Sequence, residues 1–228
     1  MTPFLNKVFT HMPNKEKIRQ MFDNIADSYD AFNHMTSVSI DKTWRKRSLK
    51  RFIEKDREQA ILDIACGTGD YSIAIAKAMN KNSHVTGLDL SEGMLKVMQE
   101  KVEKLGMNNF ISMEQGDSEN MRFEDNSFDC ATIGFGIRNF ENRPKGLVEI
   151  LRVLKPGGKI VILELSTPSN PIIRWCFNLY FLHIMPFIGG KMSGDKAAYK
   201  YLPASVLNFP KKKEWIKTME DCGYINVT

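Results

Sequence analysis

A short segment at residues 63–70, with the sequence DIACGTGD, carries the sharpest chemical signal in the chain. It begins with Asp63, and its glycines, Gly67 and Gly69, allow the backbone to approach a ligand closely. Free N–H groups at the start of a following helix can then donate hydrogen bonds to that ligand. Asp89 follows Gly69 by 20 residues (89 − 69). A carboxylate at this spacing suits a ribose, because its two oxygens can accept both hydroxyl protons.

The surrounding residues indicate which class of nucleoside-containing ligand the loop binds. Dinucleotide-binding loops have a third glycine where this chain has Ser72, and the loop lacks the Lys-Ser/Thr pair that binds nucleoside triphosphates. A ligand without a pyrophosphate therefore fits better. S-adenosylmethionine has an adenine, a ribose diol and an amino-acid tail but no phosphate, so we predict it as the cofactor. The plainer alternative is a tight turn between a strand and a helix, with a surface aspartate.

Two further loops offer polar groups. Asp117 and Ser118 lie in a Gly-Asp-Ser turn, where an acceptor beside a backbone N–H suits an adenine edge, although such turns are also common without a ligand. The segment GFGIRN, at 134–139, follows an apolar run. Ligands of doubly wound sheets bind beyond the carboxyl ends of the strands, so we expect Arg138 and Asn139 where a substrate meets the cofactor.

These loops belong to a chain in which short apolar runs alternate with segments of helical spacing. The predicted strands are 60–65, 84–90, 110–113, 128–135 and 159–165, and the predicted helices of the core are 70–79, 91–105 and 144–154. Such alternation is typical of βαβ units, and the near-continuous apolar strands favour a sheet covered on both faces. We therefore expect an α/β fold with a Rossmann-like, doubly wound, mostly parallel sheet, which brings the loops together at one edge.

Composition narrows the class of protein. The 228 residues are 43% hydrophobic and 26% charged, which is ordinary for a globular chain. The net charge of +5 is too small to indicate nucleic-acid binding. The four cysteines lie far apart, which favours reduced thiols over disulfides or a metal site. The N-terminal residues lack the apolar run of a signal peptide, so we expect a cytoplasmic protein.

Three segments outside the glycine loop complete a pattern. The first runs from Tyr29 to Arg45, the second is FGIRNF at 135–140, and the third is RVLKPGGKIVILELS at 152–166. Together they resemble the ubiquinone/menaquinone biosynthesis C-methyltransferases (UbiE/MenG type), a family of class I S-adenosylmethionine-dependent methyltransferases. The resemblance covers nearly the whole chain from about Lys17, and the third segment carries most of its specificity.

The resemblance implies C-methylation of a prenylated quinol ring, most directly demethylmenaquinol, with the benzoquinol of ubiquinone pathways as the other candidate. It implies cofactor contacts at Thr68, Asp89 and the pair Asp117–Ser118. Gly134 matches a further cofactor position, at which some members have serine. Three positions depart from the family: Phe32 replaces methionine, Asp41 replaces histidine and Leu165 replaces an aromatic residue. Because Asp41 exchanges a potential cation for an anion, a role of the family's histidine does not transfer.

The expected chemistry assigns roles to four residues. A quinol carbon becomes a good nucleophile when the ring hydroxyl loses its proton, so the site must stabilise a phenolate-like oxygen or accept that proton through water. Arg138 stays protonated and is the first candidate to hold the oxyanion or the water. Asn139 would orient the same group, and Tyr29 and Asp30 are second candidates on a helix over the pocket. The alternatives are a structural ion pair for Arg138 and lid packing for Tyr29.

Two regions suggest contact with a membrane. The apolar segment 171–188 is interrupted by polar residues, so we expect either a core-packed helix or an apolar wall for a prenyl tail, and no transmembrane helix. A basic cluster fits anionic lipid headgroups or a solvated helix face: Lys42, Arg45, Lys46, Arg47, Lys50 and Arg51. A location at the inner face of the cytoplasmic membrane follows if the apolar segment receives a prenyl tail and the basic cluster contacts lipid headgroups.

We expect one methyltransferase domain over 1–228. It divides into a helical N-terminal cover (1–58), a cofactor-binding core (59–165), an apolar insertion on the substrate side (166–210) and a last helix that leads into a strand (211–228). The family usually closes its sheet with a hairpin, which we expect to be incomplete here. The competing functions are a methyltransferase for another small lipophilic molecule and an NAD-type oxidoreductase. A homo-oligomer remains open.

Overall fold

The computed structural model describes residues 14–36, 40–168, 170–180 and 196–228. Within these ranges five parallel strands form one sheet in the order β3-β2-β1-β4-β5. The strands are β1 (Ala60–Ile64), β2 (His84–Asp89), β3 (Ile111–Gln115), β4 (Phe128–Gly134) and β5 (Leu154–Leu163). The strand order reverses at β1, so the predicted Rossmann-like, doubly wound sheet is confirmed, with its switch point between β1 and β4.

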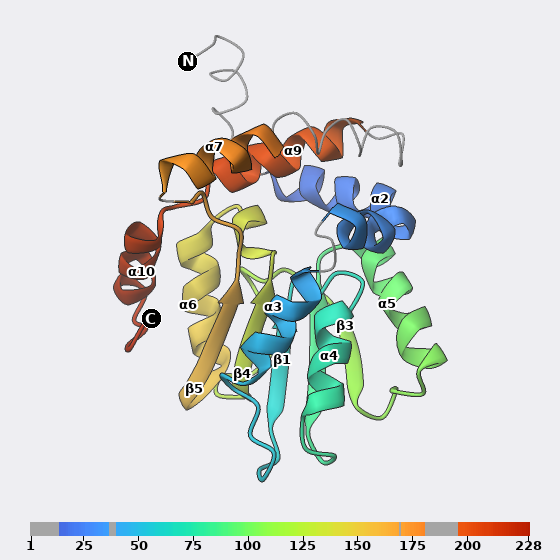
Figure 1. Cartoon of the computed structure of the whole chain (residues 1–228). Coiled ribbons are helices and arrows are strands. Elements are labelled where there is room, and N and C mark those ends of the chain that lie inside the picture. The colour runs from blue at the N-terminus through green and yellow to red at the C-terminus, as the bar shows by residue number, and fades with distance from the viewer. Residues whose placement is uncertain (1–13, 37–39, 169, 181–195) are drawn as a thin grey trace.

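The helices flank this sheet and cover its carboxyl edge (Figure 1). Their bounds are α2 (Lys15–Thr36), α3 (Ile40–Leu49), α4 (Asp70–Ala78), α5 (Glu92–Lys104), α6 (Arg143–Val153), α7 (Pro171–Leu179), α9 (Lys196–Leu207) and α10 (Lys212–Asp221), with a 3₁₀ turn at Ile137–Asn139. Side chains at helix starts explain two of the boundaries. Ser91 accepts a hydrogen bond from Met94 N at the start of α5, and Asn142 accepts one from Lys145 N at the start of α6.

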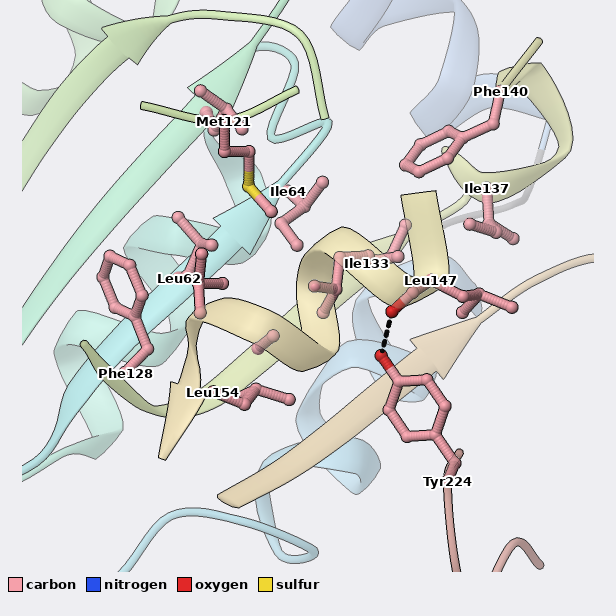
Figure 2. Close-up of a cluster of buried hydrophobic side chains, with 14 of the residues drawn as sticks. Leu62, Ile64, Met121, Phe128, Ile133, Ile137, Phe140, Leu147, Leu154 and Tyr224 are labelled. Atoms are coloured by element: carbon pink, nitrogen blue, oxygen red, sulfur yellow. Dashed lines mark hydrogen bonds between the residues drawn. The ribbon is translucent and has the colours of Figure 1, made fainter. Parts of the chain in front are cut away.

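The core has two apolar layers, one on each face of the sheet. Ile61 belongs to the layer that packs against α3, α4 and α5. Its neighbour Leu62 belongs to the layer that packs against α6 and α10. This alternation follows the two-residue period of a strand and explains the near-continuous apolar sequence of β1. Figure 2 shows the α6 layer, in which Tyr224 Oη donates a hydrogen bond to the carbonyl oxygen of Leu147 at 2.8 Å.

Two details differ from the expectations. The strand expected to begin near residue 224 does not form, because Gly223 (φ +100°) ends α10 and Tyr224 turns into the core, where its N–H donates to Met219 O. Strand β5 begins at Leu154, five residues earlier than predicted. Phe128 pairs with Leu154 and Cys130 with Lys159, so the turn residues between them bulge out of the strand.

Helices α2, α7 and α9 form a roof over the carboxyl ends of the strands (Figure 1). A third apolar cluster joins them to α5, with Ile25 of α2, Met94 of α5 and Val206 of α9 at its centre. The predicted N-terminal cover and substrate-side insertion are therefore packed together. Residues 181–188 of the apolar segment lie outside the described residues. Among the helices that the structure does describe, none has the length and apolarity needed to cross a bilayer.

Candidate active site

The glycine loop after β1 has one position fixed by packing and one that faces open space. A Cβ atom on Gly69 (φ +82°) would lie 2.4 Å from Cγ of Met98, so only glycine fits there. A Cβ atom on Gly67 (φ +56°) would meet nothing within 4 Å. Gly69 thus lets the loop pack against α5, while Gly67 leaves room for a ligand beside the backbone.

Asp89, at the end of β2, lies against this loop. Its Oδ2 accepts a hydrogen bond from Gly67 N at 2.8 Å, and its Oδ1 accepts one from Ser91 N at 2.9 Å. Burial raises the pKa of this carboxyl, and the backbone donors oppose that shift. Asp89 also lines a cavity of about 90 Å³ together with Asp117, Ser118 and Gly134. The structure therefore brings together four residues that the sequence had placed near a cofactor.

The opposite wall of this first cavity comes from α2. Lys15 Nζ lies 2.6 Å from Asp117 Oδ2 and 3.2 Å from Glu119 Oε2. The aspartate proposed for the adenine edge is thus already paired with a lysine of the cover. A ligand that binds Oδ2 of Asp117 would therefore have to displace Lys15 of α2.

Asp63 lies beneath the loop and has no exposed surface. Its carboxylate accepts hydrogen bonds from Ser72 Oγ at 2.5 Å and from Thr132 Oγ1 at 2.7 Å. Burial raises the pKa of Asp63 to about 6, although both hydroxyl donors lower it. Ser72, which stands where dinucleotide-binding loops have glycine, therefore satisfies a buried acid, and Asp63 supports the loop from below.

Thr68, at the top of the loop, is linked to the cover helix. Its Oγ1 donates to Asp30 Oδ1 at 2.5 Å. Lys101 Nζ of α5 lies 2.7 Å from Asp30 Oδ2 and 2.5 Å from Asp70 Oδ1. Asp30 is thus held by a hydroxyl and an ammonium group, and it ties α2 to the loop and to α5.

A second, larger cavity of about 380 Å³ lies beside the first, and α3, α7 and α9 contribute to its walls. Its lining includes Asp63, Thr68 and Arg138 at the base and apolar roof residues Leu165, Phe177, Tyr180 and Leu202. Five residues line both cavities: Tyr29, Ala65, Gly67, Gly134 and Phe135. The two spaces therefore meet at the ends of β1 and β4. A ligand in one can reach a ligand in the other there.

Arg138 and Asn139 lie next to this junction. Arg138 Nη1 forms a buried ion pair with Glu164 Oε1 at 2.7 Å and also donates to Phe135 O. Arg138 Nε is buried without a hydrogen-bond partner among the described residues. Asn139 lines the first cavity, and its Oδ1 accepts a hydrogen bond from Tyr201 Oη at 3.0 Å. The ion pair expected as an alternative for Arg138 is thus present, and the guanidinium still lines the second cavity.

Tyr29 is the side chain of α2 that faces both cavities. Burial raises the pKa of its hydroxyl, while Arg138 and a hydrogen bond with Asn33 lower it. The ring also contacts Phe22 edge to face, with 6.0 Å between centroids. Tyr29 therefore packs within the cover helix and also lies next to the cavities expected to hold the reacting groups.

Asp41 has a structural environment. It is buried, with its Oδ2 2.8 Å from Arg45 Nη1, and the same guanidinium lies 3.3 Å from Asp70 Oδ2. The carboxylate thus fixes α3 against α4 through a cation. This corrects the interpretation of the basic cluster, because Arg45 is tied inside the fold and is not among the cations available to lipid headgroups.

Four residues that support the site were not selected from the sequence: Lys15, Lys101, Glu164 and Tyr201. Each acts across more than 25 residues of chain, and a lysine, glutamate or tyrosine on a helix or strand has no local signal for such a role. Glu164 alone stood inside a recognised segment, at the carboxyl end of the fifth strand, and its position could have identified it.

The donors and charges fit S-adenosylmethionine better than a dinucleotide. Four carboxylates line the first cavity, those of Asp89, Asp117, Glu119 and Glu141, against the two cations Lys15 and Arg19. This excess of negative charge would repel a pyrophosphate but not a sulfonium cation. Asp89 would hold the ribose, the Asp117–Ser118 pair the adenine edge, and the backbone beside Gly67 the amino-acid tail. Among the described residues there is no cluster of His, Cys, Asp or Glu that could hold a metal ion.

Comparisons with known proteins agree with this geometry. The ubiE/COQ5 methyltransferase family model matches residues 10–228. The demethylmenaquinone methyltransferase of Staphylococcus aureus is 43% identical over 214 residues, which cover 94% of this chain and 87% of that protein.

Solved structures show the same fold. A SAM-dependent methyltransferase from Aquifex aeolicus has a TM-score of 0.50 and 23% identity, covering 67% of this chain and 78% of that one. Phosphoethanolamine N-methyltransferase 2 of Haemonchus contortus, solved with S-adenosyl-L-methionine, has a TM-score of 0.61 and 23% identity, covering 81% of this chain and 37% of that one. This chain belongs to the ubiE/COQ5 methyltransferase family, and it is a methyltransferase that uses S-adenosylmethionine.

Proposed function

We propose that this protein methylates a ring carbon of a prenylated quinol, and that demethylmenaquinol is the substrate, in menaquinone biosynthesis. The observation that carries the proposal is the pair of cavities that meet at Tyr29, Gly134 and Phe135. One is bordered by carboxylates suited to a ribose and a sulfonium, and the other has an apolar roof. The family and the S. aureus relative support the same reaction.

The apolar roof suits the substrate. Leu165, Phe177, Tyr180 and Leu202 close the second cavity on the side away from the glycine loop. An isoprenoid tail buried against such side chains gains roughly 25 cal/mol for each Å² of apolar surface removed from water. The position at which the family usually has an aromatic residue, Leu165, therefore still supplies apolar surface.

Bound S-adenosylmethionine supplies an electrophilic methyl group. The chain's own part is to orient the ring and to hold charge on its oxygen. Arg138 lines the second cavity with a guanidinium that Glu164 fixes in place, so it can stabilise a phenolate-like oxygen or a water that carries the proton away. Asn139 is oriented by Tyr201 and faces the first cavity. Tyr29 lines both cavities, so it would stand between the two bound ligands and keep water from them.

For Asp30 we propose a positioning role in place of the reacting-group role expected from the sequence. Its carboxylate is shared between Thr68 and Lys101. In this arrangement it closes the cover over the loop, and a reacting group would have to displace one of these partners to reach it. We therefore place Asp30 among the residues that position α2, and we keep Arg138, Asn139 and Tyr29 next to the reacting groups.

The test is methyl transfer from labelled S-adenosylmethionine to demethylmenaquinol in detergent, with the product identified by mass. The reduced substrate should react, while the oxidised quinone should not, because it has no ring hydroxyl to ionise. A benzoquinol with the same tail measures ring preference. Label on neither quinol, from protein that binds the cofactor, would overturn the proposal and favour another lipophilic acceptor.

Such a substrate resides in a lipid bilayer, so the proposal includes peripheral contact with an anionic membrane surface. The tail enters the enzyme from the bilayer, and the enzyme must approach the headgroups to receive it. Two surfaces could make this contact. One is the exposed side of α7, with Ile172, Ile173 and Trp175 between 56% and 73% exposed. The other is the outer side of α3.

A further inference from the structure

The outer side of α3 is basic and rigidly mounted. Its inner side is fixed to the fold by the buried Asp41–Arg45 ion pair and by Ser48 Oγ, which shares a 2.6 Å hydrogen bond with Tyr71 Oη. The residues that point outward include five cations along α3 and the turn after it, and one on α4: Lys42, Lys46, Arg47, Lys50, Arg51 and Lys77. Because the helix cannot rotate without breaking its inner contacts, these charges stay on one face.

None of these six cations forms a salt bridge within the described part of the chain, and all are exposed. The acids nearest in sequence are engaged elsewhere. Asp41 is paired with Arg45 at 2.8 Å, and the carboxylate of Glu54 lies 3.1 Å from Arg57 Nε and 3.4 Å from Lys159 Nζ. The face therefore has a net positive charge that the fold does not neutralise. The charge of this face is complementary to that of an anionic partner.

The cations border a shallow groove of about 500 Å³ between α3 and α4. Lys42, Lys46 and Lys77 stand at its rim, while Leu49 and Ile73 contribute apolar surface to its floor. The groove adjoins the second cavity, because Arg45 and Asp70 line both. A basic rim over an apolar floor matches the layered chemistry of a phospholipid surface, in which anionic headgroups lie above acyl chains.

Apolar side chains lie at the mouth of the substrate cavity on the same helix. Ile40 is 49% exposed and Trp44 is 38% exposed, and both also line the second cavity. Tryptophan is enriched at the boundary between water and lipid, because its ring is apolar and its N–H is polar. Ile40 and Trp44 thus flank α3 on the cavity side and the lysines flank it on the groove side, and the two spaces adjoin at Arg45 and Asp70.

We propose that the α3–α4 face, formed by Ile40, Trp44 and the six cations, binds the surface of an anionic phospholipid bilayer and places the substrate cavity against it. This inference rests on the proposed function, which supplies the reason for a membrane partner. It adds which face of the protein contacts the membrane, the charge of the headgroups that this face binds and the orientation of the enzyme on the bilayer. The α7 side then faces away from the headgroups or contacts them only secondarily.

The experiment is co-sedimentation of the full chain with vesicles of phosphatidylcholine, with and without 30% phosphatidylglycerol. The triple variant Lys42→Glu, Lys46→Glu, Lys77→Glu should reduce binding to the anionic vesicles by at least about tenfold, and 0.5 M salt should do the same to the unmodified protein. The control reverses the charge of three exposed lysines on α10 instead, with Lys212→Glu, Lys213→Glu and Lys217→Glu. The whole protein then has the same net charge as the triple variant, but the change lies on another face. The control should keep most of its binding.

A second measurement locates the anchor. In a Trp175→Phe, Trp215→Phe variant, Trp44 is the remaining tryptophan, and brominated lipid should quench its fluorescence. Equal loss of binding in the α3 and α10 variants would overturn the inference in favour of overall charge. Binding that depends on Trp175 and Ile172 but not on the lysines would place the membrane on α7 instead. Salt-insensitive binding, or none, would leave an acidic protein as the partner of this face and would also refute the proposal.

The outcome is separable from that of the proposed function. Turnover of a short-tailed quinol dissolved in detergent does not need the bilayer, so the α3 variant should retain it within about twofold. Activity in detergent without vesicle binding refutes the membrane face alone. Vesicle binding without methyl transfer to any quinol refutes the proposed function alone.

Discussion

Replacing Arg138 by alanine should leave the carboxylate of Glu164 buried without a cation. The two side chains are 6% and 4% exposed and their charged atoms are 2.7 Å apart, so little solvent is available to compensate. Removing one partner of such a pair costs about 3–5 kcal/mol of unfolding free energy. For a chain of this length, 1 kcal/mol shifts the melting temperature by about 2–4 °C, so the variant should melt about 6–20 °C lower.

The carboxylate's charge, rather than the lost packing, should account for most of that cost. A double variant, Arg138→Ala with Glu164→Gln, removes the charge and should recover about 2 kcal/mol relative to the single variant. Neither variant should regain activity. Loss of a single group that stabilises an oxyanion lowers kcat by about 100- to 1,000-fold, while the affinity for the cofactor product should change less than threefold.

Calorimetry gives the melting temperatures, and turnover is measured at a temperature at which every variant is folded. The matched control is Glu149→Gln, which breaks the partly exposed Glu149–Arg152 pair on α6 and should reduce stability slightly without affecting kcat. A single variant that melts within 2 °C of the parent, or a double variant no more stable than the single one, would refute the burial argument. Unchanged turnover in Arg138→Ala would remove the residue from the reaction.

Three further predictions follow from the glycine loop and its neighbours. Gly67→Ala should fold but bind S-adenosylhomocysteine at least about tenfold more weakly in calorimetric titration. Gly69→Ala should instead lower the melting temperature, because there is no room for a Cβ atom at that position. Burial raises the pKa of Asp63 to about 6 from a usual 3.8, so its contribution to stability is lost as pH rises between these values. The parent should therefore lose about 2 kcal/mol of unfolding free energy between pH 4 and pH 7 in urea unfolding, and Asp63→Asn should abolish that loss. Tyr201→Phe releases Asn139 and should lower kcat more than it raises KM, with about 1 kcal/mol of lost stability; a change in KM alone would contradict a positioning role.

The sequence was sufficient for the features that depend on local spacing. The alternation of strands and helices predicted the sheet. The serine before α5 predicted its first turn, because a short side chain at that point satisfies a free N–H group. The carboxyl ends of parallel strands meet at one edge, so Asp89, Gly134 and Arg138 could be placed near one another without coordinates.

What the sequence did not reveal depends on contacts between distant segments. Arg45 is indistinguishable from its basic neighbours in a helical sequence, yet its packing against Asp41 and Asp70 makes it a structural cation. Lys15 contacts Asp117 across 102 residues, and no periodicity encodes such a pairing. The bulge in β5 between Leu154 and Lys159 likewise depends on which residues of β4 and β5 pair, and this is decided by the sheet as a whole.

The contacts of α2 have a consequence for affinity. Lys15 holds Asp117 and Asp30 holds Thr68, so the helix competes with the cofactor for two of the groups proposed to bind it. The measured dissociation constant is then the intrinsic one divided by the fraction of molecules in which α2 has moved aside. A substitution just outside the lining of the cavity, such as Asp23→Ala, which frees α2 from Ser91 and Gly93, should tighten cofactor binding and slow product release. In this enzyme the cover helix would set how long each product stays.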